Sequence, residues 1–196
     1  MVRDLVDLLY SYHSQELYNG NENIENLLDA IEAEDDRKKG LKIPDTNFLP
    51  DALFYMEQMK LSNQINRYLK IFGAENVHII DYEDFKSDIE NTYRKVLSFL
   101  SVDTEFTPEF KVVNPNKKIR SSLLSDFVGK QPQISRTILK AITTLNFRQK
   151  IRKYLRKVNT SYVQREPMTD ELREYLTKKL APETDKISQF LNRKLS

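Results

Sequence analysis

The stretch 53–100 constrains the fold more than any other part of the sequence, because two helical patterns flank one short apolar run. Apolar side chains recur at helical spacing over residues 61–72, and Gly73 follows, where a helix often ends in a left-handed cap. The run Val77–Ile80 is largely β-branched and too brief for a helix, which is typical of a buried parallel strand. A second helical pattern covers residues 93–100. The sequence therefore predicts an α/β fold that is mostly helical, with one parallel strand buried between these helices and paired with neighbouring strands.

The residues after the apolar run indicate how the second helix starts. Asp81-Tyr82-Glu83-Asp84 predicts a turn, in which Glu83 and Asp84 cap the next helix or hold a loop. Ser87 and Glu90 have the Ser-x-x-Glu spacing of a capping box, in which each side chain bonds a backbone N–H at the other's position. We therefore expect the second helix to start at Ser87.

Helical periodicity also marks both ends of the chain. Near the start, one apolar stripe runs from Val2 to Leu17 and includes His13, and a shorter stripe spans residues 24–31. Near the end, Thr169 is a good N-cap for one helix, and a last helix is expected over residues 187–191. Between the ends, the sequence predicts a loop at residues 37–50, a short strand at residues 110–113, and helices at residues 134–145 and 147–158.

Composition limits the classes of function. Hydrophobic residues make up 39% and charged residues 31% of the 196 residues, which suits one folded, soluble domain. No apolar run approaches the roughly 20 residues of a membrane span, and Arg3 and Asp4 interrupt the pattern of a signal peptide. The absence of cysteine excludes disulfides and thiolate metal ligands and fits a cytoplasmic location. We interpret His13 and His78 as structural, so no metal site is expected.

Arg3 and Ser11 are the first candidates for ligand binding. An arginine can hold a phosphate through two parallel hydrogen bonds, and a serine hydroxyl further along the chain can add a third. The same two side chains could equally belong to the ordinary polar face of a helix. Their interpretation therefore depends on the rest of the chain.

Several segments, in their order along the chain, resemble one family of transferases. The segment Arg3–Ser11 resembles Arg-Asn/Asp-Pro-x-x-Arg-x-x-Ser of the sulfotransferases that depend on PAPS, 3′-phosphoadenosine 5′-phosphosulfate. Residues 55–72 and Gly73–Phe85 look like the helix, strand and Tyr-Glu-Asp-Leu turn of that family. Phe99–Val102 resembles the Phe-Leu-Gly-Val helix end of the family, with Ser101 in place of glycine. Asn114–Arg120 resembles the basic loop over the nucleotide, and residues 167–196 resemble the C-terminal helices. The resemblance is strongest to the bacterial carbohydrate-type branch.

This resemblance implies a P-loop-type sulfotransferase fold and an enzyme activity. The reaction would move a sulfuryl group from PAPS to a hydroxyl of a carbohydrate or similar acceptor. Its partners would be the anionic nucleotide and that acceptor, without a metal and without nucleic acid. The resemblance also implies a set of cofactor-binding residues at the 3′-phosphate end of the nucleotide: Arg3, Ser11, Asn114, Lys117, Lys118 and Arg120.

The sequence also departs from the family pattern. Leu5 stands where the family has proline, and Leu8 stands where it has a second arginine. The glycine-rich phosphosulfate-binding loop and the catalytic base, which the family places ahead of the Arg-to-Ser segment, have no counterpart here. We therefore expect a single sulfotransferase-like domain over residues 1–196 that is N-terminally incomplete and inactive alone, with its catalytic residues upstream of Met1.

Two alternatives remain open at this point. The chain could be a remnant of the family that binds a nucleotide or glycan without catalysis. It could instead use the Arg- and Lys-rich helix at residues 147–158 to bind an acidic glycan, a membrane surface or nucleic acid. A net charge of +2 and the lack of a known nucleic-acid-binding signature argue against nucleic acid.

Overall fold

The computed structural model describes residues 1–111 and 167–195 with their side chains, and the backbone of residues 117–119 and 160–162. The chain divides into two compact units. The first unit comprises residues 1–12, 54–112 and 168–196, and the second comprises residues 13–53 and 113–167. That the chain is a single sulfotransferase-like domain stays a prediction.

The first unit is mostly helical in its described part, with non-helical segments at residues 77–81 and 101–111. Its elements are the first half of α1 (Leu5–Asn19), then α4 (Tyr55–Gln58), α5 (Leu61–Phe72), the 3₁₀ turn η2 (Ala74–Asn76), α6 (Tyr82–Ser87), α7 (Ile89–Phe99) and α11 (Asp170–Leu191). The core of the unit contains fully buried side chains from α1, α4 and α11, among them Leu5, Leu9, Tyr55, Leu176 and Ile187. The predicted helices around residues 61–72 and 93–100 are therefore confirmed as α5 and α7.

Helix α5 ends at Gly73, as the sequence predicts, but in a different conformation. Gly73 has φ 81° and ψ 152°, and its N–H donates to the carbonyl of Leu69 at 3.0 Å. A left-handed helical cap would have ψ near +47°. The positive φ is confirmed, whereas the left-handed helical cap is wrong because the chain leaves this helix in an extended direction.

The predicted strand Val77–Ile80 is not confirmed. This segment is extended, and the pairing of the described residues around it consists of one parallel bridge between Val2 and Asp81. Val2 N–H donates to the Ile80 carbonyl at 2.7 Å, and Tyr82 N–H donates to the Val2 carbonyl at 2.7 Å. Ile79 and Ile80 are half-buried and His78 is exposed, so the expected full burial between α5 and α7 is wrong. The pairing does not continue beyond Val2 toward the C-terminus, because helix α1 starts at Leu5.

The helix starts that follow differ from the predicted turn and capping box. Residues 82–87 form helix α6, and Asp81 caps it by accepting a hydrogen bond from Glu83 N–H at 3.1 Å. Asp88 caps α7 through Asn91 N–H at 3.1 Å. The Ser87 hydroxyl instead donates to the Glu83 carbonyl at 2.7 Å, so it closes α6. The Ser87–Glu90 capping box is wrong because an aspartate one residue later occupies the capping position.

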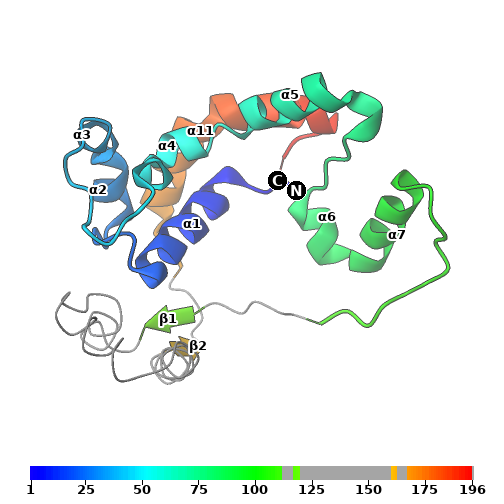
Figure 1. Cartoon of the computed structure of the whole chain (residues 1–196), viewed down its shortest axis with the longest axis horizontal. Helices are drawn as coiled ribbons and strands as arrows, with labels where there is room; N and C mark the ends of the chain where they lie inside the picture. The colour runs from blue at the N-terminus through cyan, green and yellow to red at the C-terminus, as the bar shows by residue number, and fades with distance from the viewer. Residues whose placement is uncertain (112–116, 120–159, 163–166, 196) are drawn as a thin grey trace, which may run out of the picture. The chain divides into compact units, whose positions relative to one another are not determined.

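The C-terminal segment forms one helix where the sequence predicts two. Thr169 caps α11 by accepting a hydrogen bond from Leu172 N–H, as expected. The helix then continues through Pro182 to Leu191. Glu183, which directly follows Pro182, accepts a hydrogen bond from Ser62 N–H in the first turn of α5 at 2.7 Å. This bond joins α11 to α5, which lie side by side in Figure 1, so a contact with α5 holds the helix immediately after Pro182.

The described part of the second unit contains the rest of α1, two short helices, one 3₁₀ turn and two short strands. These are α2 (Leu27–Glu32), α3 (Glu34–Arg37), the 3₁₀ turn η1 (Pro50–Leu53), β1 (Lys117–Ile119) and β2 (Thr160–Tyr162). Asn26 caps α2 through Leu28 N–H at 2.8 Å. Strands β1 and β2 are antiparallel, with Lys118 opposite Ser161. Lys117 and Lys118 thus lie in a strand, where the resemblance predicts a loop.

Some predictions fall partly or wholly outside the described residues. Asn114, Arg120 and the helices expected at residues 134–145 and 147–158 are among them. Phe110 and Lys111 are described and are not in a strand, whereas residues 112 and 113 of that predicted strand are not described.

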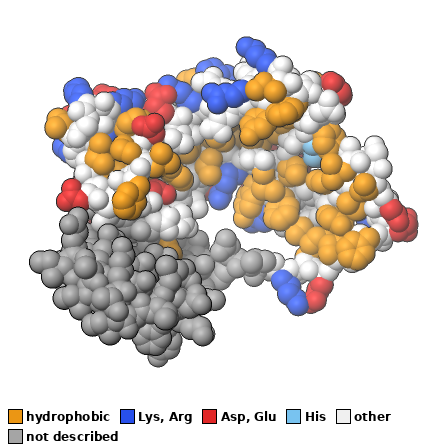
Figure 2. Space-filling view, in the orientation of Figure 1, with side chains coloured by type: hydrophobic (Ala, Val, Ile, Leu, Met, Phe, Trp, Pro, Cys, Tyr) orange, Lys and Arg blue, Asp and Glu red, His pale blue; other side chains and the backbone are white. Residues whose placement is uncertain are grey.

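The first unit exposes apolar side chains at its surface (Figure 2). Ile71 and Phe72 at the end of α5 are 66% and 53% exposed, and Leu100 after α7 is 57% exposed. Phe99 stacks on the exposed ring of His78, with ring centroids 5.1 Å apart. The prediction that His78 is structural is consistent with this ring contact, although the residue is not in the core.

Candidate functional site

The candidate site begins with Arg3, which lies between the Val2 bridge and the start of α1. Asp4 caps α1 by accepting a hydrogen bond from Asp7 N–H at 2.8 Å. The Arg3 guanidinium lies over the Tyr82 ring, 4.7 Å from its centroid, and its Nη2 is 3.8 Å from Asp7 Oδ2. Each such contact contributes about 0.5–1 kcal/mol where the groups are partly exposed. Arg3 is therefore oriented but only weakly neutralised.

The donors of Arg3 are not all used. Its Nε atom is buried and has no hydrogen-bond partner among the described residues, while the side chain as a whole is 28% exposed. A buried donor without a partner is costly, and an anion that accepts from it removes that cost. Arg3 also lies next to the N-terminus of α1, where the helix dipole favours negative charge. These features fit a phosphate group better than they fit an ordinary surface arginine.

Ser11 lies further along α1, on the same unit as Arg3. It is half-buried and takes part in interactions of its own. The helix advances about 9 Å from its first residue to Ser11, which is within the reach of an extended arginine and a phosphate together. Asn114 and Arg120 lie outside the described residues, and the side chains of Lys117 and Lys118 are not described. Whether the six predicted residues converge on one ligand therefore stays a prediction.

His13 is a buried structural residue, as the sequence predicts. It is 2% exposed, and its Nε2 lies 2.9 Å from the Ile24 carbonyl. Burial lowers the pKa of His13, against the opposing effects of the Ile24 hydrogen bond and the nearby Glu22 carboxylate. The neutral imidazole that results connects α1 to the backbone at Ile24 within the second unit.

Three residues were not assigned a role by sequence reasoning, of which one contacts Arg3 and two are linked to it through the Val2–Asp81 bridge. Tyr82 supplies the ring under the Arg3 guanidinium, Asp81 holds the start of α6, and Arg193 bonds to Asp81. The Tyr-Glu-Asp motif at residues 82–84 was a signal for the first of these, but it predicted a turn. Arg193 carries no local signal, because its partners lie far away in the sequence.

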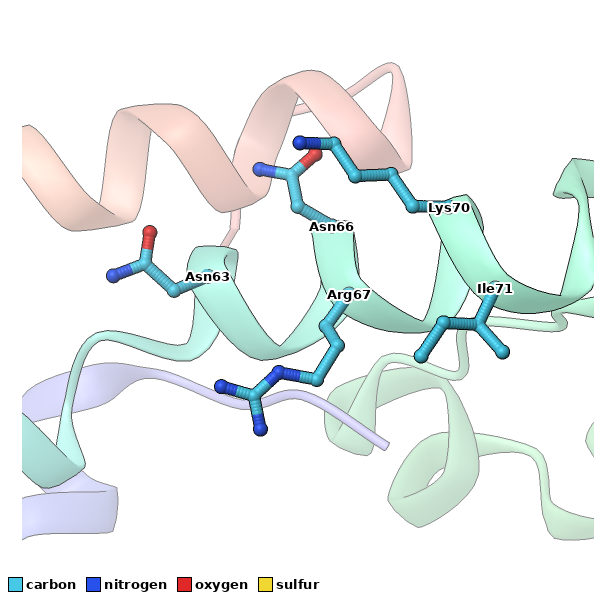
Figure 3. Close-up of a pocket in the computed structure, with 5 residues that line it drawn as sticks. All are labelled: Asn63, Asn66, Arg67, Lys70 and Ile71. Atoms are coloured by element: carbon cyan, nitrogen blue, oxygen red, sulfur yellow. The ribbon is translucent and has the colours of Figure 1, made fainter.

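A second polar feature of the first unit is a hollow on the exposed face of α5 (Figure 3). Its volume is about 520 Å³, and its lining residues all belong to this helix: Asn63, Asn66, Arg67, Lys70 and Ile71. No carboxylate of the described residues lies within ion-pair distance of Arg67 or Lys70, and α5 itself contains no acidic residue. The hollow thus offers amide groups and positive charge to a solute.

Among the described side chains, no group of three or more His, Asp or Glu residues is arranged to hold a metal ion. Within the same part of the chain, no helix has the length and apolar character needed to cross a membrane.

Comparison with known proteins now supplies the family. The model of the sulfotransferase domain family matches residues 1–195 of this chain. The chain belongs to the sulfotransferase family. This confirms the family predicted from the segments that begin at Arg3.

A solved structure agrees with this assignment at the level of the fold. The structure of a sulfotransferase from Alicyclobacillus acidocaldarius superposes on this sulfotransferase-family chain with a TM-score of 0.61 and 19% sequence identity. The match covers 98% of this chain and 53% of the Alicyclobacillus protein, so the chain spans about half the length of that relative. A search of curated proteins gives no match.

Proposed function

We propose that this chain forms the part of a PAPS-dependent sulfotransferase that binds the 3′-phosphate end of the nucleotide. In the reaction, the bond from sulfur to the phosphosulfate oxygen breaks, and sulfur bonds to an acceptor hydroxyl oxygen. Adenosine 3′,5′-bisphosphate leaves, and a base takes the hydroxyl proton. The residues proposed here serve binding and orientation, since none of them is assigned as that base.

The observation that carries this proposal is the state of Arg3. It has a buried donor without a described partner, weak contacts to Tyr82 and Asp7, and a helix N-terminus beside it. Membership of the sulfotransferase family supports a nucleotide as the anion. Ser11, Asn114, Lys117, Lys118 and Arg120 are proposed to complete the site.

For the acceptor we propose a carbohydrate or similar polyhydroxyl compound. The hollow on α5 supports this, because Asn63 and Asn66 offer both donors and acceptors to hydroxyl groups. Arg67 and Lys70 would favour an acceptor that carries carboxylate or sulfate groups. The cytoplasmic location expected from the sequence stays a prediction, as does the unlikelihood of nucleic acid as a partner.

A pair of nucleotides tests the binding role. Calorimetric titration of the whole chain with adenosine 3′,5′-bisphosphate and with adenosine 5′-phosphate isolates the contribution of the 3′-phosphate. We expect the bisphosphate to bind more tightly, and Arg3→Ala to remove most of that difference. A hydrogen bond to a charged group contributes about 1.5–3 kcal/mol, so the loss should be about 10- to 100-fold.

A matched control and a contrary result complete this test. Arg94→Ala removes a similar charge from an exposed pair with Glu90 on α7 and should leave both affinities unchanged. Equal binding of the two nucleotides, or an unaltered preference in Arg3→Ala, would contradict the proposal. Transfer of label from radiolabelled PAPS to a panel of glycans then separates an enzyme from a protein that only binds.

A further inference from the structure

Arg193, close to the C-terminus, joins the segment after α11 to the start of α6. Its Nη2 lies 2.8 Å from Asp81 Oδ2 and 2.7 Å from Asp84 Oδ2. It follows the left-handed residue Asn192 that ends α11, and Leu195 beyond it is buried. Figure 1 shows both chain ends beside α6, in agreement with these contacts. The C-terminus is thus fixed to the segment that follows Ile80.

Asp81 connects this ion pair to the backbone around it. Its side chain is 1% exposed, so the carboxylate depends on partners from the protein. One oxygen accepts from Arg193, the other caps α6 at Glu83 N–H, and its carbonyl accepts from Phe85 N–H at 3.1 Å. Loss of Arg193 would leave this buried carboxylate without its described cation, which favours a rearrangement of Asp81 toward water.

The backbone on both sides of Asp81 holds the residue before Arg3. Ile80 accepts from Val2 N–H and Tyr82 donates to the Val2 carbonyl, both at 2.7 Å. The Tyr82 side chain then lies under the Arg3 guanidinium. A displacement of Asp81 would therefore shift both supports of Arg3, namely its backbone and the ring that orients its side chain.

We infer that Arg193 is a positioning residue for Arg3, acting through Asp81, Tyr82 and Val2. This inference rests on the proposed function, in which Arg3 binds the 3′-phosphate. The other contact of Arg3, to Asp7, is long at 3.8 Å, and Asp7 also pairs with Arg173 at 2.7 Å. Asp7 alone does not fix the guanidinium, so the Tyr82 ring decides its direction.

The first experiment measures the position of Arg3 directly. In the folded chain, the side-chain protons of Arg3 should show the upfield NMR shifts of groups that lie over an aromatic ring. We expect Arg193→Gln to reduce these shifts and Arg193→Lys to restore part of them, because lysine keeps the charge for Asp81. Arg94→Gln, which breaks the exposed pair with Glu90 on α7, should leave the shifts unchanged. Unchanged Arg3 shifts in Arg193→Gln would overturn the inference.

The second experiment asks whether the position matters for binding. Arg193→Gln should weaken adenosine 3′,5′-bisphosphate about tenfold and leave adenosine 5′-phosphate unchanged, because the effect passes through the 3′-phosphate contact. Equal weakening of both nucleotides would assign Arg193 a merely structural role and overturn the inference. If the wild-type chain shows no preference for the bisphosphate, the proposed function fails, and the NMR result still decides whether Arg193 positions Arg3. If Arg193→Gln does not fold, Arg193→Lys carries both measurements with a smaller expected change.

Discussion

Arg37 and Glu22 form an ion pair in which both side chains are completely excluded from solvent, with 2.9 Å between Arg37 Nη2 and Glu22 Oε2. The remaining guanidinium nitrogens of Arg37 donate to carbonyls of Ala30, Leu53 and Lys42, at 3.2–3.4 Å. Glu22 also accepts from the backbone N–H groups of the next two residues. This pair therefore ties α2, α3 and the loop that follows them around one buried polar centre.

Replacement of Arg37 by methionine should strongly destabilise the second unit. The change leaves the Glu22 carboxylate buried without its cation, and breaking such a pair typically costs about 3–5 kcal/mol. Urea unfolding followed by circular dichroism would measure the loss in the free energy of unfolding. Lys42→Gln, which breaks an exposed pair with Asp36 in the same unit, should hardly move the unfolding midpoint. Equal effects of the two variants would contradict a special role for the buried pair.

A double variant tests whether the cost comes from the unpaired charge. Glu22→Gln alone removes the Glu22 carboxylate from the buried Arg37 guanidinium. Together with Arg37→Met, it removes both charges from the interior. The double variant should therefore lose less stability than the sum of the single variants. Strict additivity would mean that the two side chains do not act as a pair.

The stability of the chain should fall on mild acidification because of His13. Burial lowers the pKa of His13 in the folded chain, while the unfolded chain has the ordinary value near 6.5. The unfolded state then binds more protons between these two values, so the free energy of unfolding decreases as the pH falls below about 6.5. The contribution of the neutral His13 to the free energy of unfolding is fully retained above that pH. His13→Gln should flatten this part of the stability profile, and an NMR titration placing the His13 pKa above its ordinary value would refute the argument.

Replacement of Gly73 by alanine should destabilise the junction between α5 and the extended segment. At φ 81° and ψ 152°, Gly73 lies in a backbone region that is essentially restricted to glycine, and strain there costs about 1–3 kcal/mol. An added Cβ would also meet the Glu75 carboxylate. Combining Gly73→Ala with Glu75→Ala separates the two causes in urea unfolding. Full recovery in the double variant would assign the loss to crowding rather than to backbone strain.

Local sequence patterns predicted the helices well, because a helix depends on neighbours within a few residues. The apolar repeats of α1, α5 and α7 and the cap at Thr169 are examples. The strand predicted at Val77–Ile80 was not confirmed, since strand pairing depends on a partner elsewhere in the chain. Arg37 illustrates the limit of sequence-based prediction for single residues. Its local sequence resembles that of its charged neighbours, whereas its burial depends on Glu22, which is distant in sequence.

In the candidate site, too, local patterns were predictable from the sequence and long-range contacts were not. Arg3 and Ser11 were found through the spacing of one segment, and the family assignment they led to is confirmed. Tyr82 lies under the Arg3 guanidinium, and Arg193 bonds to Asp81, only because the fold brings these distant residues together. Long-range contacts of this kind leave no periodic signal in the sequence.

The hollow on α5 should bind acidic oligosaccharides through Arg67 and Lys70. Replacing both by serine should weaken a sulfated disaccharide about tenfold, or about 1.4 kcal/mol, in calorimetry at low salt. Arg94→Ser with Lys95→Ser removes the same charge from exposed positions of α7, outside the hollow, and is the matched control. An equal loss in this control would show that only the overall charge matters. Asn63→Ala with Asn66→Ala should instead weaken sulfated and neutral sugars alike, because amides bond hydroxyl groups that both sugars carry.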